Sequence, residues 1–173
     1  AFAVPNGRIY FHTGLIALTE SEAQLLAVLT HEITHVLERH SLKTKRSVYN
    51  KTAFMSTFGG FGLGGLLIQF WGLSSIYGYS QILEQRADLG AFNMLREGGY
   101  DINEIPKFYR ILSENLVKQG RNPNYFFSTH PKVRQRIKVY EELIEENGLA
   151  DSSGTVTSDE YESLMDEIIY AHI

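Results

Sequence analysis

The sequence contains no cysteine. This absence excludes disulfide bonds, thiolate zinc sites and cysteine nucleophiles, although it does not fix the compartment in which the protein works. No signal peptide is visible at the start of the chain either. Because the chain does not begin with methionine, this second absence says little about secretion.

Basic residues are missing from residues 141–173, which hold ten Asp and Glu side chains and no Lys or Arg. All 16 Lys and Arg lie in residues 1–140, where they are scattered rather than clustered. We therefore expect no binding to nucleic acid. The remaining composition, 43% hydrophobic and 21% charged, is ordinary for one globular domain with a core.

Turn and capping signals in the sequence predict a mainly helical chain that begins with a small β-element. Residues 1–18 are predicted to form a hairpin, because Asn6-Gly7 is a two-residue turn signal with β-rich flanks. The capping box Thr19-x-x-Glu22 predicts a helix from about residue 20. Further helices are expected over residues 80–97, 103–119 and 131–148 and, after a loop, from the capping box Thr157-x-x-Glu160 onward.

The stretch THEITHVLERHS, residues 30–41, lies on the helix expected from residue 20. Residues four apart share one face of a helix, so His31 and His35 present two imidazoles one turn apart. This is the arrangement of two of the three protein ligands of a catalytic zinc. Glu32 lies beside the first ligand, where its carboxylate can reach a metal-bound water. HEITH is therefore an H-E-x-x-H motif with two ligands and a general base, unless it arose in this helix by chance.

His40 is expected on the protein surface, outside this site. It follows His31 by nine residues and so faces about 180° away from it on a continuous helix. It is also one residue short of the extended motif that supplies a third histidine ligand, and Glu38 stands where that motif needs glycine. We expect neither Glu38 nor His40 to take part in the site.

Glu84 is the best candidate for the third zinc ligand. It shares one face of the predicted helix 80–97 with Asp88 and with small and apolar residues. Two carboxylates on an inward face are costly unless a partner compensates them, and a zinc ion with its histidines would do so. Asp88, one turn later, would accept the second N–H of a ligand histidine. The alternative is a solvated helix face; Glu97, Asp101 and Glu104 are weaker candidates near helix ends.

Four segments in this order resemble the CAAX prenyl protease and HtpX-like family of zinc metallopeptidases. They are AFAVPNGRIYFHTGLI at the start, HEITH, EQRAD at residues 84–88, and THPKVRQRI at residues 129–137. The resemblance covers residues 1 to about 140. It implies His31, His35 and Glu84 as zinc ligands and Glu32 as the catalytic base, and it maps the family's His-Pro motif and following arginine onto His130 and Arg136. Where relatives often carry a second acid, this chain has Arg86, which we expect to face outward.

The sequence leaves more than one role open for His130 and Arg136. Arg136 borders a helical apolar stripe, where a partly buried guanidinium needs an anionic partner. That partner is either a carboxylate of the site or a substrate carbonyl on its way to an oxyanion. His130 could hydrogen-bond the tetrahedral intermediate, bind zinc in a resting enzyme, as in some bacterial members, or only cap the next helix.

Charged side chains are absent from residues 52–83, over 32 positions rich in glycine. If His31, His35 and Glu84 bind one zinc, this segment crosses a membrane an even number of times. Two crossings need about 40 apolar residues and a turn, so we expect no transmembrane span. A helical hairpin near the cleft fits better, and contact with a membrane surface stays open.

These patterns predict a mainly α protein with a small β-element, a zincin-like α+β domain. Residues 1–150 are expected to form the peptidase domain, and residues 151–173 an acidic loop and a helix docked on it.

The predicted function is a Zn²⁺-dependent endopeptidase that cleaves peptides or unfolded proteins in the bacterial periplasm or envelope. The edge strand near residues 9–13 could pair with an extended substrate. The rivals are a self-inhibited enzyme and an inactive, chaperone-like metal-binding module. The sequence does not predict an oligomeric state.

Overall fold

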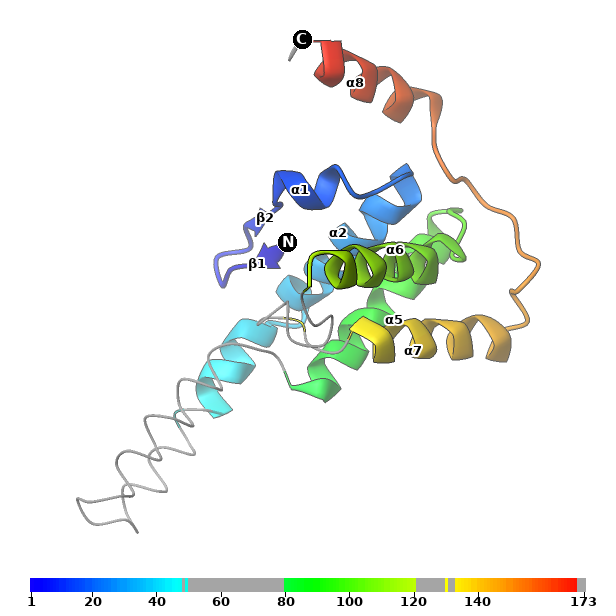
Figure 1. Ribbon diagram of the computed structural model, residues 1–173. Coiled ribbons are helices and arrows are strands. Elements are labelled where there is room, and N and C mark those ends of the chain that lie inside the picture. Colours follow the sequence, from blue (N-terminus) through cyan, green and yellow to red (C-terminus); the bar gives the residue numbers. More distant parts are fainter. Residues whose placement is uncertain (48, 50–79, 121–129, 131–132, 171–173) are drawn as a thin grey trace, which may run out of the picture.

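The computed structural model describes residues 1–47, 49, 80–120, 130 and 133–170, of which residues 168–170 are described by their backbone only. The predicted hairpin within residues 52–83 therefore lies almost wholly outside the described residues, as does Pro131. Elements are labelled as in Figure 1, where the C-terminal helix stands apart from the helices that surround the core.

The N-terminal β-element is a hairpin, as predicted. Strand β1 (Phe2–Ala3) pairs antiparallel with β2 (Ile9–Tyr10), with Ala3 opposite Ile9. The turn differs from the expected two-residue type: Gly7 N–H donates to Val4 at 3.0 Å, and Gly7 has a φ of 85°. This is a three-residue loop whose last residue takes the left-handed conformation that glycine tolerates. The predicted strand near residues 9–13 is shorter than expected, because helix α1 (Thr13–Ile16) begins at Thr13.

Helix α2 (Glu22–Leu37) carries the H-E-x-x-H motif. Its N-cap is Ser21, whose hydroxyl accepts from the backbone N–H of Gln24 at 3.2 Å. The predicted capping residue Thr19 instead donates its hydroxyl to the Ile16 carbonyl. The capping prediction was therefore wrong by two residues, because a second hydroxyl residue with a Gln three positions later lies nearer the apolar stripe.

Helix α5 (Gln81–Glu97) packs along α2 and brings the second half of the site to it (Figure 1). Ser80 caps its N-terminus and Gly98 is its C-cap, so the helix agrees with the predicted range of residues 80–97. A Cβ added to Gly90 would lie 2.3 Å from the Thr34 hydroxyl of α2. Only glycine at this position lets the two backbones approach this closely.

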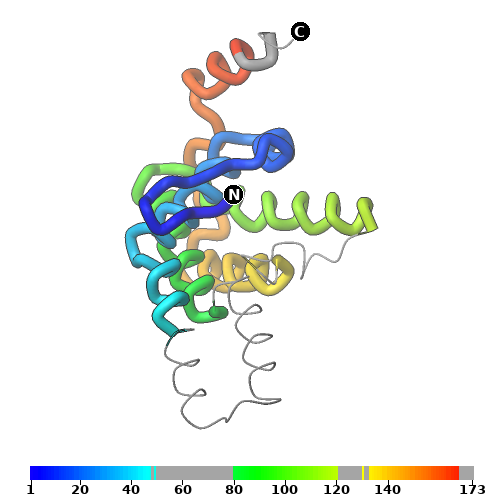
Figure 2. Tube along the Cα trace, turned by 90° about the vertical axis from the view of Figure 1, so that its left-hand side faces the viewer, coloured from blue at the N-terminus to red at the C-terminus, as the bar shows by residue number. Residues whose placement is uncertain are grey.

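Two further helices close the core. Helices α6 (Glu104–Lys118) and α7 (Val133–Glu146) pack against each other, and α6 also contacts α2. In the tube view, α6 extends outward from the body and the N-terminal hairpin runs along α2 (Figure 2). The largest side chains that are fully buried in this core are Phe92, Leu95, Ile102, Ile105, Phe108, Val133 and Tyr140.

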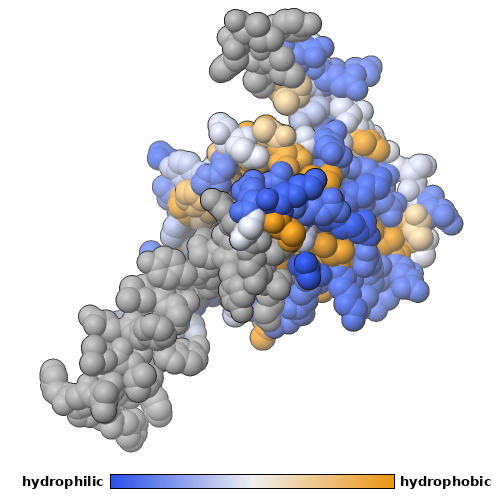
Figure 3. Space-filling view, in the orientation of Figure 1, coloured by the Kyte–Doolittle hydropathy of each residue, from blue (hydrophilic) through white to orange (hydrophobic). Residues whose placement is uncertain are grey.

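The acidic end of the chain has two parts. Residues 151–158 run back over the core: Thr155 pairs with Tyr100, and the Val156 carbonyl accepts from the Ala23 N–H at 2.9 Å. Helix α8 (Asp159–Tyr170) follows, stands apart from the other helices in Figure 1, and shows mainly hydrophilic side chains in Figure 3. Leu164 of this helix is 53% exposed. Docking of this helix, like the boundary at residue 150, stays a prediction.

The described residues confirm the predicted fold class, a mainly helical protein with one two-stranded sheet. Among them, no helix is both long and apolar enough to cross a membrane.

Candidate metal centre

Four buried side chains converge on one point between α2, α5 and the start of α7. They are His31, His35, Glu84 and His130, and one ligand atom from each lies within 4.8 Å of all the others. The Nε2 atoms of His31 and His35 are 2.9 Å apart, and each lies within 3.6 Å of the Glu84 carboxylate. The structure thus brings together the three sequence-predicted ligands, and it adds His130 as a fourth member.

His130 enters the cluster from a segment about 100 residues away in sequence from α2. Its Nδ1 atom lies 3.0 Å from Glu84 and 3.3 Å from His31 Nε2. Its Nε2 atom faces Glu32 at 3.2 Å. The imidazole therefore lies between the predicted ligand carboxylate, Glu84, and the predicted general base, Glu32.

Glu32 is buried beside the four-residue cluster but is not part of it. Its Oε1 atom faces His130, whereas Oε2 has no hydrogen-bond partner among the described residues. Burial alone would raise the pKa of this carboxyl, but the hydrogen bond and charge of His130 bring it to about 2. Glu32 is therefore an ionised carboxylate with one free oxygen, as a base that acts on water requires.

The titratable groups of the cluster differ strongly in pKa. Burial lowers the pKa of His35 to about 4, so this imidazole is neutral at pH 7 and has a lone pair to give a metal. Burial would also lower the pKa of His130, but the carboxylates of Glu84 and Glu32 raise it to about 9. The pKa of Glu84 lies well below its usual range despite burial, because His130 faces it. One positive charge thus faces two carboxylates, which leaves a net negative charge that a metal cation would compensate.

Asp88 lies behind His31, as the spacing from Glu84 predicts. One of its oxygens is 3.1 Å from His31 Nδ1 and accepts from the Tyr140 hydroxyl at 2.8 Å. Arg136 also donates to Asp88, with Nε at 2.9 Å, and its guanidinium lies 4.3 Å from the Tyr109 ring centre. The anionic partner of Arg136 in this structure is therefore a site carboxylate.

Arg136 also approaches His31 Nδ1, at 2.7 Å from Nη2. A guanidinium only donates and a carboxylate only accepts, so one Nδ1 atom cannot serve both partners. A neutral imidazole that binds a metal through Nε2 carries its proton on Nδ1. Metal binding through Nε2 would therefore select the hydrogen bond from His31 Nδ1 to Asp88.

The surface position expected for His40 is wrong. His40 is fully buried, and its Nδ1 atom lies 2.8 Å from Nδ1 of His35. The argument from helix phase failed because Arg39, with a φ of 55°, interrupts the helix after Leu37. Glu38, also expected to be uninvolved, lies 3.1 Å from His40 Nε2 and accepts from Lys43 and Arg86. No periodic pattern in the sequence signals this break.

The weaker ligand candidates lie elsewhere. Glu104 is buried against Ser21 and Gln24, where it receives two hydrogen bonds near the N-terminus of α2. Glu97 and Asp101 are not members of the cluster. Arg86 faces outward, as expected.

Comparison with known proteins identifies the domain. Residues 1–144 match the model of peptidase family M48. The chain belongs to this family. It is 27% identical over 149 residues to the putative beta-barrel assembly-enhancing protease of Vibrio cholerae, an alignment that covers 79% of this chain and 31% of that protein.

Other relatives of this M48 domain come from bacteria and from mitochondria. It is 27% identical over 152 residues to the beta-barrel assembly-enhancing protease of Escherichia coli, covering 79% of this chain and 30% of the relative. It is 26% identical over 152 residues to the mitochondrial metalloendopeptidase OMA1 of Schizosaccharomyces pombe, covering 84% and 44%. The chain thus spans less than half the length of these relatives. Family membership confirms the predicted class, a metallopeptidase domain.

The M48 assignment implies a metal, and the cluster fits one. Three imidazole nitrogens and one carboxylate face one another in a buried site, which is a donor set suited to zinc. Two neutral Nε2 atoms at 2.9 Å would repel each other without a proton or cation between them. The free Oε2 atom of Glu32 lies beside this set, where a water could bind.

Proposed function

We propose that this M48 domain is a zinc-dependent endopeptidase with His31, His35 and Glu84 as its metal ligands. The observation that carries the proposal is the buried ligand cluster with an ionised carboxylate, Glu32, directly beside it. Asp88 holds the ring of His31 through its Nδ1–H, which fixes the tautomer that leaves Nε2 for the metal.

Bound in this site, zinc supplies Lewis acidity, which lowers the pKa of a water and polarises a carbonyl. Glu32 takes the proton of that water on Oε2 and later passes it to the amine nitrogen that leaves. Burial of the site keeps bulk water out and strengthens these electrostatic contacts. Arg136 holds Asp88 in place by donating from Nε, so it supports the site through the carboxylate behind His31.

His130 supports a second candidate function, a self-inhibited peptidase. Its Nδ1 atom belongs to the same cluster as the three proposed ligands and lies 3.0 Å from Glu84. In this form His130 would be a fourth protein ligand and would exclude substrate from the metal. The same imidazole already faces Glu32 in the structure, and once displaced from the metal it could hydrogen-bond a developing oxyanion. Both roles for His130 can belong to one enzyme in two states.

Peptides or unfolded proteins are the proposed substrates, and a bacterial periplasm or envelope is the proposed compartment. Support comes from relatives that are named as beta-barrel assembly-enhancing proteases, while the mitochondrial relatives leave a second compartment to be tested. Protein quality control is the proposed setting. The boundary between a peptidase domain of residues 1–150 and an acidic tail belongs to the same proposal.

The test combines zinc content with hydrolysis of an unstructured protein such as casein. Wild type, Glu32→Gln, His130→Ala and the control Glu114→Gln, which makes the same change at an exposed glutamate of α6, would be compared. We expect about one zinc per chain in all four proteins, no turnover in Glu32→Gln, and activity in the control equal to wild type. Higher activity in His130→Ala would support self-inhibition, and lower activity the oxyanion role. Absence of zinc from the wild type would overturn the proposal, and zinc without activity in every variant would favour a metal-binding module.

A further inference from the structure

A chain of three side chains leads from the metal centre to the protein surface. His35 presents Nε2 to the cluster and Nδ1 to His40 at 2.8 Å. His40 turns its other nitrogen, Nε2, to the Glu38 carboxylate at 3.1 Å. The two imidazole rings meet edge to face, with centres 4.8 Å apart and an interplanar angle of 73°. Both rings are almost fully buried, so water does not replace these contacts.

When His35 is a metal ligand, only one arrangement of protons satisfies the hydrogen bonds that link His35, His40 and Glu38. A neutral imidazole has one N–H and one lone pair. If Nε2 of His35 gives its lone pair to the metal, Nδ1 carries the proton and donates it to His40 Nδ1. His40 must then hold its own proton on Nε2, where Glu38, which only accepts, receives it. No donor meets a donor, and no lone pair meets a lone pair.

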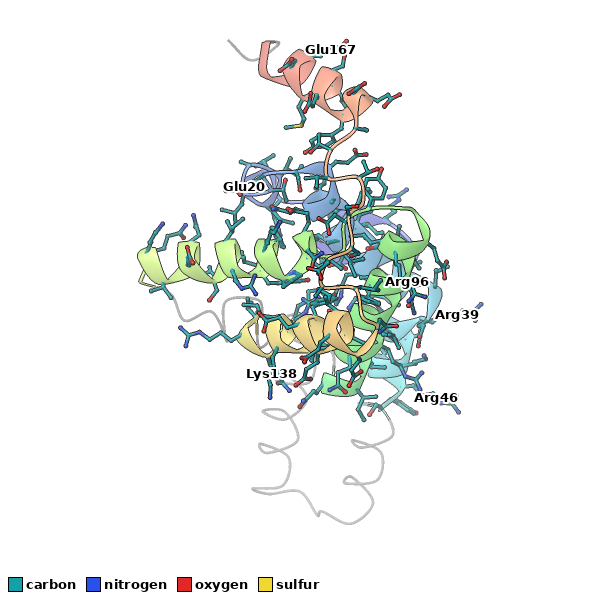
Figure 4. The ribbon with its side chains drawn as sticks, turned by 90° about the vertical axis from the view of Figure 1, so that its right-hand side faces the viewer. Glu20, Arg39, Arg46, Arg96, Lys138 and Glu167 are labelled. Carbon is teal, nitrogen blue, oxygen red and sulfur yellow. The ribbon has the colours of Figure 1, made fainter. Side chains whose placement is uncertain are left out.

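The backbone conformation of one residue makes this chain possible. Arg39 has a φ of 55°, which is uncommon for a residue other than glycine. The Arg39 N–H donates to Val36, and the following helical turn restarts with Lys43 N–H donating to Arg39. Arg39 itself is exposed at the edge of the molecule (Figure 4). The break therefore turns the next residue, His40, inward beneath His35.

We propose that His40 is a positioning residue for the zinc ligand His35, and that Glu38 anchors it. His40 accepts the Nδ1–H of His35, holds its ring in place and leaves Nε2 free for the metal. This inference rests on the proposed function, because it concerns the same ligand. It assigns a metal-supporting role to two residues outside the H-E-x-x-H motif.

Glu38 is itself held in place from two elements. It accepts from Lys43 of the helical turn that follows His40, at 3.1 Å, and from Arg86 of α5, at 3.2 Å. Glu38 thus joins α5, which carries Glu84, to the end of α2, which carries His35. The anchor, Glu38, is a carboxylate at the surface. The two buried side chains that it supports, His40 and His35, are both neutral imidazoles.

The experiment measures zinc affinity by competition with a chromophoric chelator. The variants are His40→Leu, which removes the acceptor, and His40→Asn, whose Oδ1 stands close to the position of Nδ1. His12→Leu is the matched control, since His12 is an exposed histidine at the N-cap of α1 with no side-chain cap hydrogen bond. We expect His40→Leu to bind zinc about 10- to 100-fold more weakly. His40→Asn should keep most of the affinity, and His12→Leu all of it.

A spectroscopic readout separates positioning from general stability. With Co²⁺ in place of zinc, the visible d–d bands report ligand geometry, so His40→Leu should shift them while His40→Asn preserves them. Equal zinc affinity and equal spectra in His40→Leu and wild type would overturn the inference. So would an equal loss in His40→Asn and His40→Leu. If His40→Leu does not fold, His40→Asn alone decides, because a weakly binding His40→Asn that folds contradicts the role. A wild type that binds no zinc would instead overturn the proposed function.

Discussion

The two proposed ligand histidines of α2, His31 and His35, have very different hydrogen-bond partners on the side away from the cluster. His31 meets Asp88, a fully buried carboxylate that also receives Tyr140 and Arg136. His35 meets a neutral imidazole, His40, and reaches a carboxylate only at the surface. We call these the Asp88 arm and the His40 arm. One arm places a charge in the core and compensates it there, whereas the other keeps charge out of the core.

The difference shows two ways to fix the tautomer of a metal ligand. A buried carboxylate polarises the ligand strongly, but it must be matched by a buried cation, and each of the two depends on the other. An imidazole polarises the ligand less, but it needs no buried counterion. Loss of one member should therefore affect stability in the Asp88 arm and mainly metal binding in the His40 arm.

The largest effect is expected from Asp88→Ala. This change leaves the buried Arg136 guanidinium without its carboxylate, so the free energy of unfolding of the zinc-free protein should fall by about 3–5 kcal/mol. Urea unfolding in the presence of a chelator measures it. The double variant Asp88→Leu/Arg136→Met removes both charges and should recover much of the loss. A single variant that loses less than about 1 kcal/mol would show that Asp88 and Arg136 do not depend on each other.

A smaller loss is expected when the two helices that carry both arms are forced apart. Gly90→Ala places a Cβ against the Thr34 side chain, so α5 must move away from α2. The free energy of unfolding should fall by about 1–3 kcal/mol, and zinc affinity should fall with it, because Glu84 moves relative to the histidines. Gly14→Ala is the control, since a Cβ at Gly14 meets no atom within 4 Å. Unchanged zinc affinity in Gly90→Ala would show that the site tolerates the shift.

The free energy of unfolding of the zinc-free protein should depend on pH through His130, which lies in the cluster where the two arms meet. The pKa of His130 is about 9 in the folded chain, against 6.5 as the ordinary value. Its contribution to stability is therefore fully present below pH 6.5 and is lost as pH rises to about 9. The slope should not exceed about 1.4 kcal/mol per pH unit. Urea unfolding between pH 6 and 9.5 should show this fall in wild type and not in His130→Gln, and parallel curves would refute it.

The smallest effect is expected at the outer end of the His40 arm. Arg86 and Glu38 form an exposed ion pair, so Arg86→Ala should lower the free energy of unfolding by about 0.2–1 kcal/mol. Raising the salt concentration to about 1 M should remove most of that difference, because salt screens exposed charges. The Asp88→Ala loss should persist in the same salt. A difference for Arg86→Ala that salt does not change would argue against an electrostatic role.

Most of the fold could be predicted from sequence because local signals determine it. Ser80 and Gly98 mark the ends of α5, and the spacing of Glu84 and Asp88 places both carboxylates on its inward face. Helical periodicity likewise places His31 and His35 on one face of α2. These predictions needed only residues within one or two turns of each other.

The remaining features depend on information that is not local. The inward turn at His40 follows from a left-handed Arg39, which is neither glycine nor asparagine and so gives no signal. His130 joins a cluster with residues about 100 positions earlier, and only the resemblance to a family pointed to it. The pairing of Arg136 with Asp88, rather than with substrate, required the packing of α7 against α5 to be known.

The contact of residues 151–158 with α2 has a consequence for the order of folding. The Ala23 amide, in the first turn of α2, finds its acceptor in the Val156 carbonyl, and the Glu22 side chain accepts from the Ser158 N–H at 2.8 Å. During synthesis the helix with the H-E-x-x-H motif is made first, whereas these acceptor and donor groups leave the ribosome more than 130 residues later. The first turn of α2 therefore stays incomplete until residues 156–158 have been made.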